Sequence, residues 1–403
     1  MHTPFGHLSY CTNIHAGESW ADHFSSLQKC IPEVKQKISP GKPFGIGLRL
    51  SHEASLELGS GNNLKVFKQW LADNDCYVFT MNGFPYGGFH RVKVKDDVHT
   101  PDWTTTARVD YTIRLFNLLS VLLPDQVGGI STSPLSYRHW HDGQKKAEVY
   151  KTATENILKV VEHLITLKKY TGKSLHLDIE PEPDGLLETG TEFIAWYRRY
   201  LWPAGKQLLK TKLDLTDQAA ADALHEHVQL CYDICHFAVG YEDHREVIDQ
   251  LKKYGIQTGK IQISAALKAP LTLPVENRSS TIEAFQKFNE STYLHQVVAR
   301  TTSGEFIRYP DLPPALADAN NTNVTEWRSH FHVPLFVKDY GAVQSTQEDI
   351  VTVLAIQKET PFTQQLEVET YTWEVLPEAL KLPITESVVR ELNWVVGCLN
   401  GKA

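Results

Sequence analysis

Short apolar runs alternate along the chain with longer segments in which apolar residues recur every three or four positions. The short runs are typical of buried β-strands, and the longer segments are typical of helices that cover a sheet. The strands that we predict lie at residues 8–14, 44–50, 77–81, 129–132, 174–179, 228–233, 260–264 and 366–371. The predicted helices lie between them, at residues 64–72, 105–122, 149–170, 192–209, 245–254 and 350–357. Eight strands with intervening helices predict an α/β protein, a (β/α)8 TIM barrel.

The alternation breaks once, between the seventh and eighth strands. Residues 269–348 contain several prolines, an Asn-Asn-Thr-Asn run and two further β-like runs at 294–300 and 329–337. We therefore predict a single barrel domain over residues 1–403 with an insertion at 269–348. Long insertions in barrel enzymes usually belong to the loops that build the site, which makes a lid one interpretation. A peripheral or dimer-forming hairpin is the other.

Composition narrows the class of partner. The hydrophobic share is 42% and the charged share 22%, and no apolar run approaches the roughly 20 residues of a membrane helix. A net charge of -8, from acids scattered without basic blocks, argues against nucleic acid or an anionic membrane and favours a small molecule. The start of the chain shows no secretory leader, and the six cysteines form no zinc-binding pattern, so we expect a cytoplasmic protein with reduced thiols.

Acidic residues gather where the fifth predicted strand ends. Glu180, Glu182 and Asp184 follow an apolar run and are separated by two prolines that stiffen the turn. The carboxyl ends of barrel strands are where sites are built, and grouped carboxylates suit a hard divalent cation or acid/base chemistry. A surface acid held in a salt bridge is the alternative interpretation of Glu180.

The next three strands also carry groups that bind metals. Asp233 ends the sixth strand, Gln262 lies in the seventh, and Glu369 lies in the eighth, where Glu367 and Glu374 are rival candidates. Consecutive strands place their ends side by side, so these oxygens can converge with Glu180 on one cation. Such oxygen ligation favours Mn²⁺ or Mg²⁺, with Co²⁺ or Zn²⁺ possible if His236 or His332 joins the site.

Further polar residues at strand ends are candidates for the walls of a substrate pocket. His15 follows the first strand and Asn82 the third, and Arg300 has the chemistry to hold a carboxylate or phosphate. His330 and His332 share a face if residues 329–337 form a strand. A structural ion pair is the alternative for Arg300, and a packed residue of the insertion is the alternative for His332.

The segments around these residues resemble those of the xylose-isomerase-like TIM barrels. Ile179-Glu180-Pro181-Glu182-Pro183 resembles the family's Ile-Glu-Pro-Lys-Pro signature, and Asp233 with His236 resembles its acid-x-x-His motif. Ile261-Gln262-Ile263 resembles the metal-binding glutamine segment of hydroxypyruvate-isomerase-like members. Val368-Glu369 resembles the segment with the family's closing glutamate. The resemblance implies Glu180, Asp233, Gln262 and Glu369 as metal ligands. It implies His236 as a residue that contacts the substrate.

Three stretches resemble more narrowly the EboE branch of that superfamily. They are residues 8–20, 329–334 and 369–377, so the resemblance spans essentially the whole chain. It implies a role in the processing or traffic of secondary-metabolite precursors, with proteins of the same gene cluster as partners. The superfamily sets fold and metal chemistry, and it does not name a substrate.

One position departs from the family and changes the expected chemistry. Glu182 stands where the signature has a lysine, so the cation that would polarise a sugar carbonyl in a hydride shift is replaced by an acid. We therefore predict isomerisation or epimerisation of a small hydroxy-carbonyl metabolite by proton transfer, with Glu180 and Glu369 as acid and base and Glu182 beside the substrate. The alternatives are a metabolite-binding or handover protein without turnover and, last, a metal-dependent phosphodiesterase.

Overall fold

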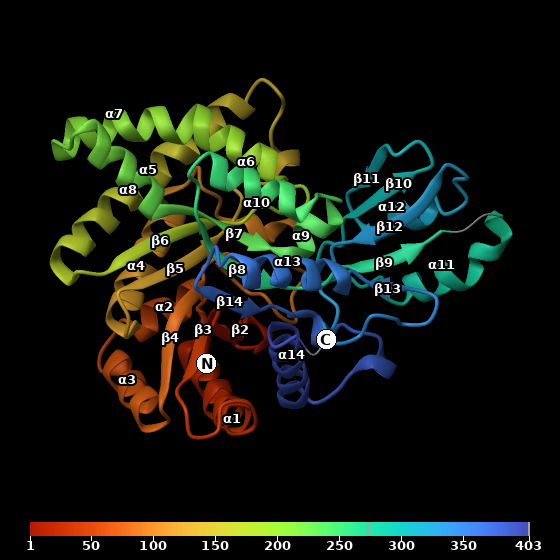
Figure 1. Cartoon of the computed structure of the whole chain (residues 1–403), viewed down its shortest axis with the longest axis horizontal. Helices are drawn as coiled ribbons and strands as arrows, with labels where there is room; N and C mark the ends of the chain where they lie inside the picture. Colours follow the sequence, from red (N-terminus) through yellow and green to blue (C-terminus); the bar gives the residue numbers. More distant parts are fainter. Residues whose placement is uncertain (272–273, 402–403) are drawn as a thin grey trace.

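The computed structural model describes residues 1–271 and 274–401, and its main sheet is a nearly closed barrel (Figure 1). Eight parallel strands run in the order β2-β14-β8-β7-β6-β5-β4-β3, and β1 (His2–Thr3) pairs antiparallel with β2. The barrel strands are β2 (Gly6–Tyr10), β3 (Phe44–Arg49), β4 (Cys76–Asn82), β5 (Val127–Thr132), β6 (Ser174–Ile179), β7 (Val228–Asp233), β8 (Thr258–Ile263) and β14 (Gln365–Val368). Between β2 and β3, Ser9 Oγ donates to Gly45 O at 2.6 Å and Cys11 forms a bridge with Gly47. All eight predicted strands are thus present.

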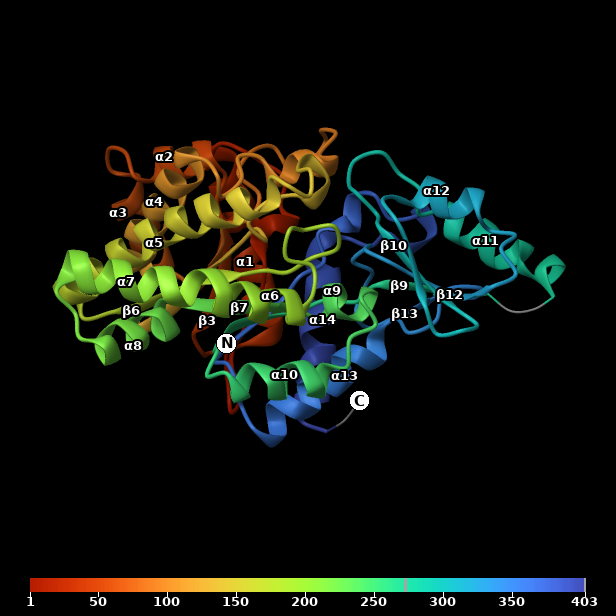
Figure 2. The same cartoon turned by 90° about the horizontal axis from the view of Figure 1, so that it is seen from above.

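Helices surround this sheet (Figures 1 and 2). They are α1 (Trp20–Ile38), α2 (His52–Leu58), α3 (Asn63–Asp73), α4 (Thr106–Leu122), α5 (Lys146–Thr171), α6 (Gly190–Trp196), α7 (Trp202–Leu213), α8 (Asp217–His227), α9 (Ile234–Val239), α10 (His244–Lys253), α13 (Gln347–Glu359) and α14 (Ile384–Leu399). The six predicted helices all occur, the fourth of them divided by a π-helical turn at Tyr197–Leu201. Of the helices around the barrel, the sequence prediction missed α1, α2, α8, α9 and α14. No helix among the described residues has the length and apolar character needed to cross a membrane.

A second, antiparallel sheet lies beside the barrel, at the right of Figure 1. Its strands, in spatial order, are β11 (Phe306–Tyr309), β10 (Val297–Thr301), β12 (Val324–Ser329), β9 (Leu267–Pro270) and β13 (Gln344–Ser345), with α11 (Ser279–Gln286) and α12 (Leu312–Ala317) between them in the chain. This segment falls within the predicted span 269–348, of which residues 272–273 lie outside the described part. The predicted run 294–300 overlaps β10. The predicted strand at 329–337 is wrong, because β12 ends at Ser329 and the chain turns there.

The barrel interior carries buried charge in place of an apolar core. Lys260 Nζ on β8 lies 2.7 Å from Glu367 Oε2 on β14, and neither side chain is exposed. Two glycines make room for buried acids, since a Cβ at Gly47 would lie 1.7 Å from Glu367 Oε1 and one at Gly259 would lie 1.9 Å from Asp178 Oδ1. The barrel interior therefore holds an ion pair between β8 and β14, two of the strands that lead to the predicted site.

We expect Lys260→Met to lower the free energy of unfolding by about 3–5 kcal/mol, because Glu367 would be left buried and unpaired. The double variant Lys260→Met/Glu367→Leu should recover much of that loss, since no isolated charge remains. Urea titration followed by circular dichroism measures both changes. A single variant as stable as wild type would contradict this account of the interior.

Candidate metal centre

Three carboxylates meet at the carboxyl end of the barrel. Glu180 directly follows β6, Asp233 is the last residue of β7, and Glu369 directly follows β14. One oxygen from each lies within 4.8 Å of the other two, and all three side chains are buried. The backbone fixes their positions, because Glu180 N donates to Thr132 O at 3.0 Å and Glu369 N donates to Ile263 O at 3.0 Å. Neighbouring strands thus hold the three acids in register.

Burial and mutual repulsion strongly perturb this group. Burial, followed by the nearby Asp233, raises the pKa of Glu180 well above its usual value. Burial, followed by the charge of Glu180, does the same to the pKa of Glu369. The pKa of Asp233 is lowered although burial opposes this, because His236 and His332 stabilise its charge. Like charges are thus crowded where a cation would relieve them.

Unpartnered atoms in the group test whether a cation fits. Glu180 Oε2, Asp233 Oδ2 and His332 Nε2 are buried without a hydrogen-bond partner among the described residues. His332 Nδ1 lies 3.0 Å from the carbonyl oxygen of Glu369 and donates to it, which leaves Nε2 with a free lone pair. Buried polar atoms are nearly always satisfied, so these atoms fit a divalent cation, the group that the predicted site requires.

The structure distinguishes between the three candidate glutamates near β14. Glu367 is paired with Lys260, and Glu374 lies 2.9 Å from the exposed Arg91 Nη2. Only Glu369 joins Glu180 and Asp233. Its Oε1 also accepts hydrogen bonds from Asn13 Nδ2 at 2.8 Å and Asn82 Nδ2 at 3.0 Å, two donors that stabilise its ionised form.

Gln262 lies on β8, fully buried, in register with Asp233 on β7. Its Oε1 lies 2.8 Å from Cys231 Sγ, whose thiol donates to it, and its Nε2 has no partner among the described residues. The amide oxygen is therefore already engaged by a neighbour. The ligand role of Gln262 stays a prediction, and His332 competes with it for that position.

A pocket with an empty volume of about 550 Å³, its open mouth included, lies above the carboxylates. Predicted site residues that line it are Asn82, Glu180, Glu182, His236, His332 and Glu369; further lining residues are Asn13, His99, Tyr293, Gln296, His330 and Tyr371. No sequence pattern indicated His99, Tyr293 or Gln296, because these residues come from loops whose course the strand pattern does not determine.

Two predicted wall residues do not line this pocket. His15 is buried, and its Nε2 lies 2.9 Å from the hydroxyl of Tyr10. Arg300 lies on β10, 45% exposed, with Nη2 3.3 Å from Glu326 Oε2 and its guanidinium over the ring of Tyr241. The structure therefore gives Arg300 the partners of a surface ion pair, and it is not part of the site we describe.

Comparisons with known proteins define the fold class. One similar solved structure is the IolI protein with a bound zinc atom, 12% identical with a TM-score of 0.50, covering 98% of this chain and 99% of that one. Another is a xylose isomerase-like TIM barrel protein from Mycobacterium smegmatis in complex with magnesium, 11% identical with a TM-score of 0.52, covering 100% and 99%. A scan of family models and a search of curated proteins found no match. The fold is therefore that of the xylose isomerase-like TIM barrels.

We expect the wild-type protein to hold about one Mn²⁺ per chain after reconstitution. The variants Glu180→Gln and Asp233→Asn should lose most of this manganese, because each substitution removes a charged ligand. Elemental mass spectrometry on desalted protein measures the content. Glu242→Gln is a matched control, since Glu242 is a half-buried glutamate that accepts a hydrogen bond from Gly190 N and belongs to none of the candidate ligand groups. Equal manganese in wild type and both site variants would contradict the site.

Stability should fall as the pH is lowered from 7 towards 4. Burial, with His90 nearby, lowers the pKa of His15 to about 4, whereas its unfolded value is near the ordinary 6.5. In this window the unfolded chain binds the proton and the folded chain does not, so acid favours unfolding by up to about 3 kcal/mol from this residue. Urea titrations at pH 7 and 4.5 should show a smaller difference in His15→Gln than in wild type. Equal differences would refute the assignment.

Proposed function

We propose that this protein is a metal-dependent isomerase or epimerase acting on a small hydroxy-carbonyl metabolite, a sugar or sugar phosphate, by proton transfer. The observation that carries the proposal is the meeting of two buried glutamates that line the pocket, Glu180 and Glu369, with Asp233 beside them. Two carboxylates that can reach one substrate are suited to the removal and return of a proton.

The two glutamates have complementary surroundings. Glu369 accepts two amide hydrogen bonds, from Asn13 and Asn82, which stabilise its ionised form against the burial and the charge of Glu180 that raise its pKa, and we assign it the role of base. Glu180, which has an unpartnered oxygen, would be the group that returns the proton. A divalent cation held by Glu180, Asp233 and Glu369, with Gln262 or His332, would supply the polarisation that makes the neighbouring C–H acidic. Mn²⁺ or Mg²⁺ suits the oxygen-rich set, and Zn²⁺ or Co²⁺ becomes competitive if His332 joins.

Loops from both sheets enclose the pocket. Val94 N and Lys95 N, in the loop after β4, donate to Thr292 O, and Tyr293 Oη donates to Phe89 O at 3.0 Å. These bonds support the proposal that residues 269–348 are an insertion that acts as a lid and excludes water from the reacting carbon. Glu182, His236 and His332 are then placed to contact the substrate from the pocket wall.

The narrower role follows the sequence resemblance alone. As the EboE resemblance implies, the substrate would be a precursor in secondary metabolism, and proteins of the same gene cluster would be partners. A cytoplasmic location belongs to the same proposal. The alternative is a handover protein that keeps pocket and metal without turnover, and the loss of the signature lysine at Glu182 favours it.

Solvent exchange tests the proposal directly. The Mn²⁺-loaded protein is incubated with a panel of ketoses, aldoses and their phosphates in deuterated water, and proton NMR follows loss of the signal beside the carbonyl. We expect exchange with at least one member, and a decrease of about 10²–10⁴-fold in Glu369→Gln and Glu180→Gln. Glu242→Gln serves as the control that keeps the rate.

Two outcomes would count against turnover. A ligand that binds, seen as a rise in the thermal midpoint, but exchanges no deuterium would identify the handover protein. Exchange that survives in both glutamate variants would place the acid and base elsewhere.

A further inference from the structure

A second group of potential metal ligands lies beside the carboxylates, and it contains histidine nitrogens. Glu182, His236 and His330 each offer one ligand atom within 4.8 Å of the other two, and all are buried. Glu182 lies in the loop after β6, His236 on α9, and His330 directly after β12 of the second sheet. Three segments distant in sequence therefore bring one carboxylate and two imidazoles together.

Hydrogen bonds on the outer side determine how the two imidazoles face each other. His236 Nδ1 lies 3.0 Å from Pro181 O, a carbonyl that only accepts, so we assign the proton to Nδ1. His330 Nδ1 lies 2.9 Å from Gln296 Oε1. The amide nitrogen of Gln296 donates to Pro183 O at 3.0 Å, which fixes its oxygen toward His330. Both imidazoles thus donate from Nδ1, and each keeps a lone pair on Nε2.

The two Nε2 atoms lie close together, and the rings are nearly perpendicular to each other. His236 Nε2 lies 3.0 Å from His330 Nε2. Two neutral imidazoles in this arrangement repel unless a cation lies between them. The separation is close to the roughly 3.3 Å between two nitrogens bound 2.0–2.1 Å from a tetrahedral zinc ion. An outward Nδ1–H bonded to a carbonyl is also the usual arrangement of a zinc-binding histidine.

We propose that Glu182, His236 and His330 bind a second divalent cation of the zinc type, separate from the one held by Glu180, Asp233 and Glu369. Two histidines and one glutamate are a known zinc ligand set, and they leave a fourth position for water or substrate. All three residues line the pocket, so that position faces the substrate space. The second site stands on its own ligands and does not depend on the isomerase proposal.

The identity of residue 182 supports this assignment. The xylose isomerase signature has a lysine at this position, and here an acid takes its place. Glu182 Oε1 lies 2.9 Å from His99 Nε2 but is buried without a hydrogen-bond partner among the described residues, so it is free to bind a cation. A metal ion bound there would supply positive charge beside the buried carboxylate of Glu182.

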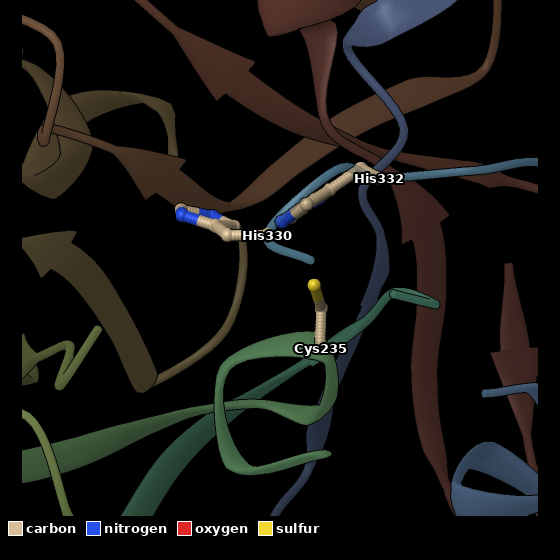
Figure 3. A group of neighbouring side chains, drawn as sticks. All are labelled: Cys235, His330 and His332. Atoms are coloured by element: carbon tan, nitrogen blue, oxygen red, sulfur yellow. The ribbon is translucent and has the colours of Figure 1, made fainter. Parts of the chain in front are cut away.

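A neighbouring cysteine is a weaker ligand than it first appears. Cys235 Sγ, at the start of α9, is directed toward His330 and His332, and the three form another group within 4.8 Å (Figure 3). Burial, followed by the charge of Asp233, raises the pKa of the Cys235 thiol well above its usual value. Metals bind the thiolate, so Cys235 would have to lose its proton to join the ligand set, whereas the neutral imidazoles already offer a lone pair.

Zinc titration of the chelator-treated protein tests the second site. After desalting, we expect elemental mass spectrometry to find about two Zn²⁺ per chain in wild type, one for each ligand set. His330→Ala and Glu182→Lys should each hold about one, Glu180→Gln about one, and the double variant Glu180→Gln/His330→Ala close to none. Glu182→Lys is chosen because it replaces the metal charge with the ammonium of the family signature and leaves both histidines in place.

The histidine variant has a matched control. His139→Ala removes a half-exposed histidine that pairs with Asp184 outside the ligand set, and it should keep two zinc ions. Circular dichroism of each zinc-free variant verifies the fold. Uptake of a single zinc ion by wild type, unchanged in His330→Ala, would overturn the proposal and indicate that a proton lies between the two imidazoles. If the protein binds two zinc ions but catalyses no solvent exchange, the second metal site is supported and only the isomerase proposal fails.

Discussion

Charge buried inside the barrel has to be compensated inside the barrel, because water does not reach it. At mid-depth Lys260 neutralises Glu367, and the pair is complete without any added group. Glu180, Asp233 and Glu369 also face one another, and no side chain among the described residues pairs with all three. This difference separates a complete structural ion pair from a candidate place for a metal ion. The strands deliver both sets of side chains by the same alternation.

The sequence pattern was sufficient for the barrel. Each strand is a short apolar run, and the ends of β6 and β7 carry Glu180 and Asp233 where the pattern indicated them. The choice between Glu369 and Glu367 required the structure, because strand alternation places both on the same face. Only the pairing of Glu367 with Lys260 distinguishes their roles. Local periodicity cannot reveal such a partner, since the pairing is a property of two strands distant in sequence.

The second sheet was the part of the fold least predictable from the sequence, because its contacts also join residues that are distant in sequence. Residues 329–337 read as a strand by composition, yet β12 ends at Ser329 and the following residues turn into the barrel mouth. The turn lets His330 meet His236 and lets His332 meet Glu369. Tertiary contacts here override β-propensity, which is a weak guide outside a paired ladder. His330 and His332, the candidate site residues for which the sequence was least informative, are the ones that this turn brings to the barrel mouth.

The hydrogen bond between Asn13 and Glu369 joins residues 356 positions apart. Asn13 lies just after β2, the first barrel strand, and Glu369 lies just after β14, the last. Since β2 and β14 are neighbours in the sheet, this contact forms only where the barrel closes on itself. A chain in which β14 had left the sheet would keep Glu180 and Asp233 at the ends of β6 and β7 and would lack the third carboxylate of the candidate site.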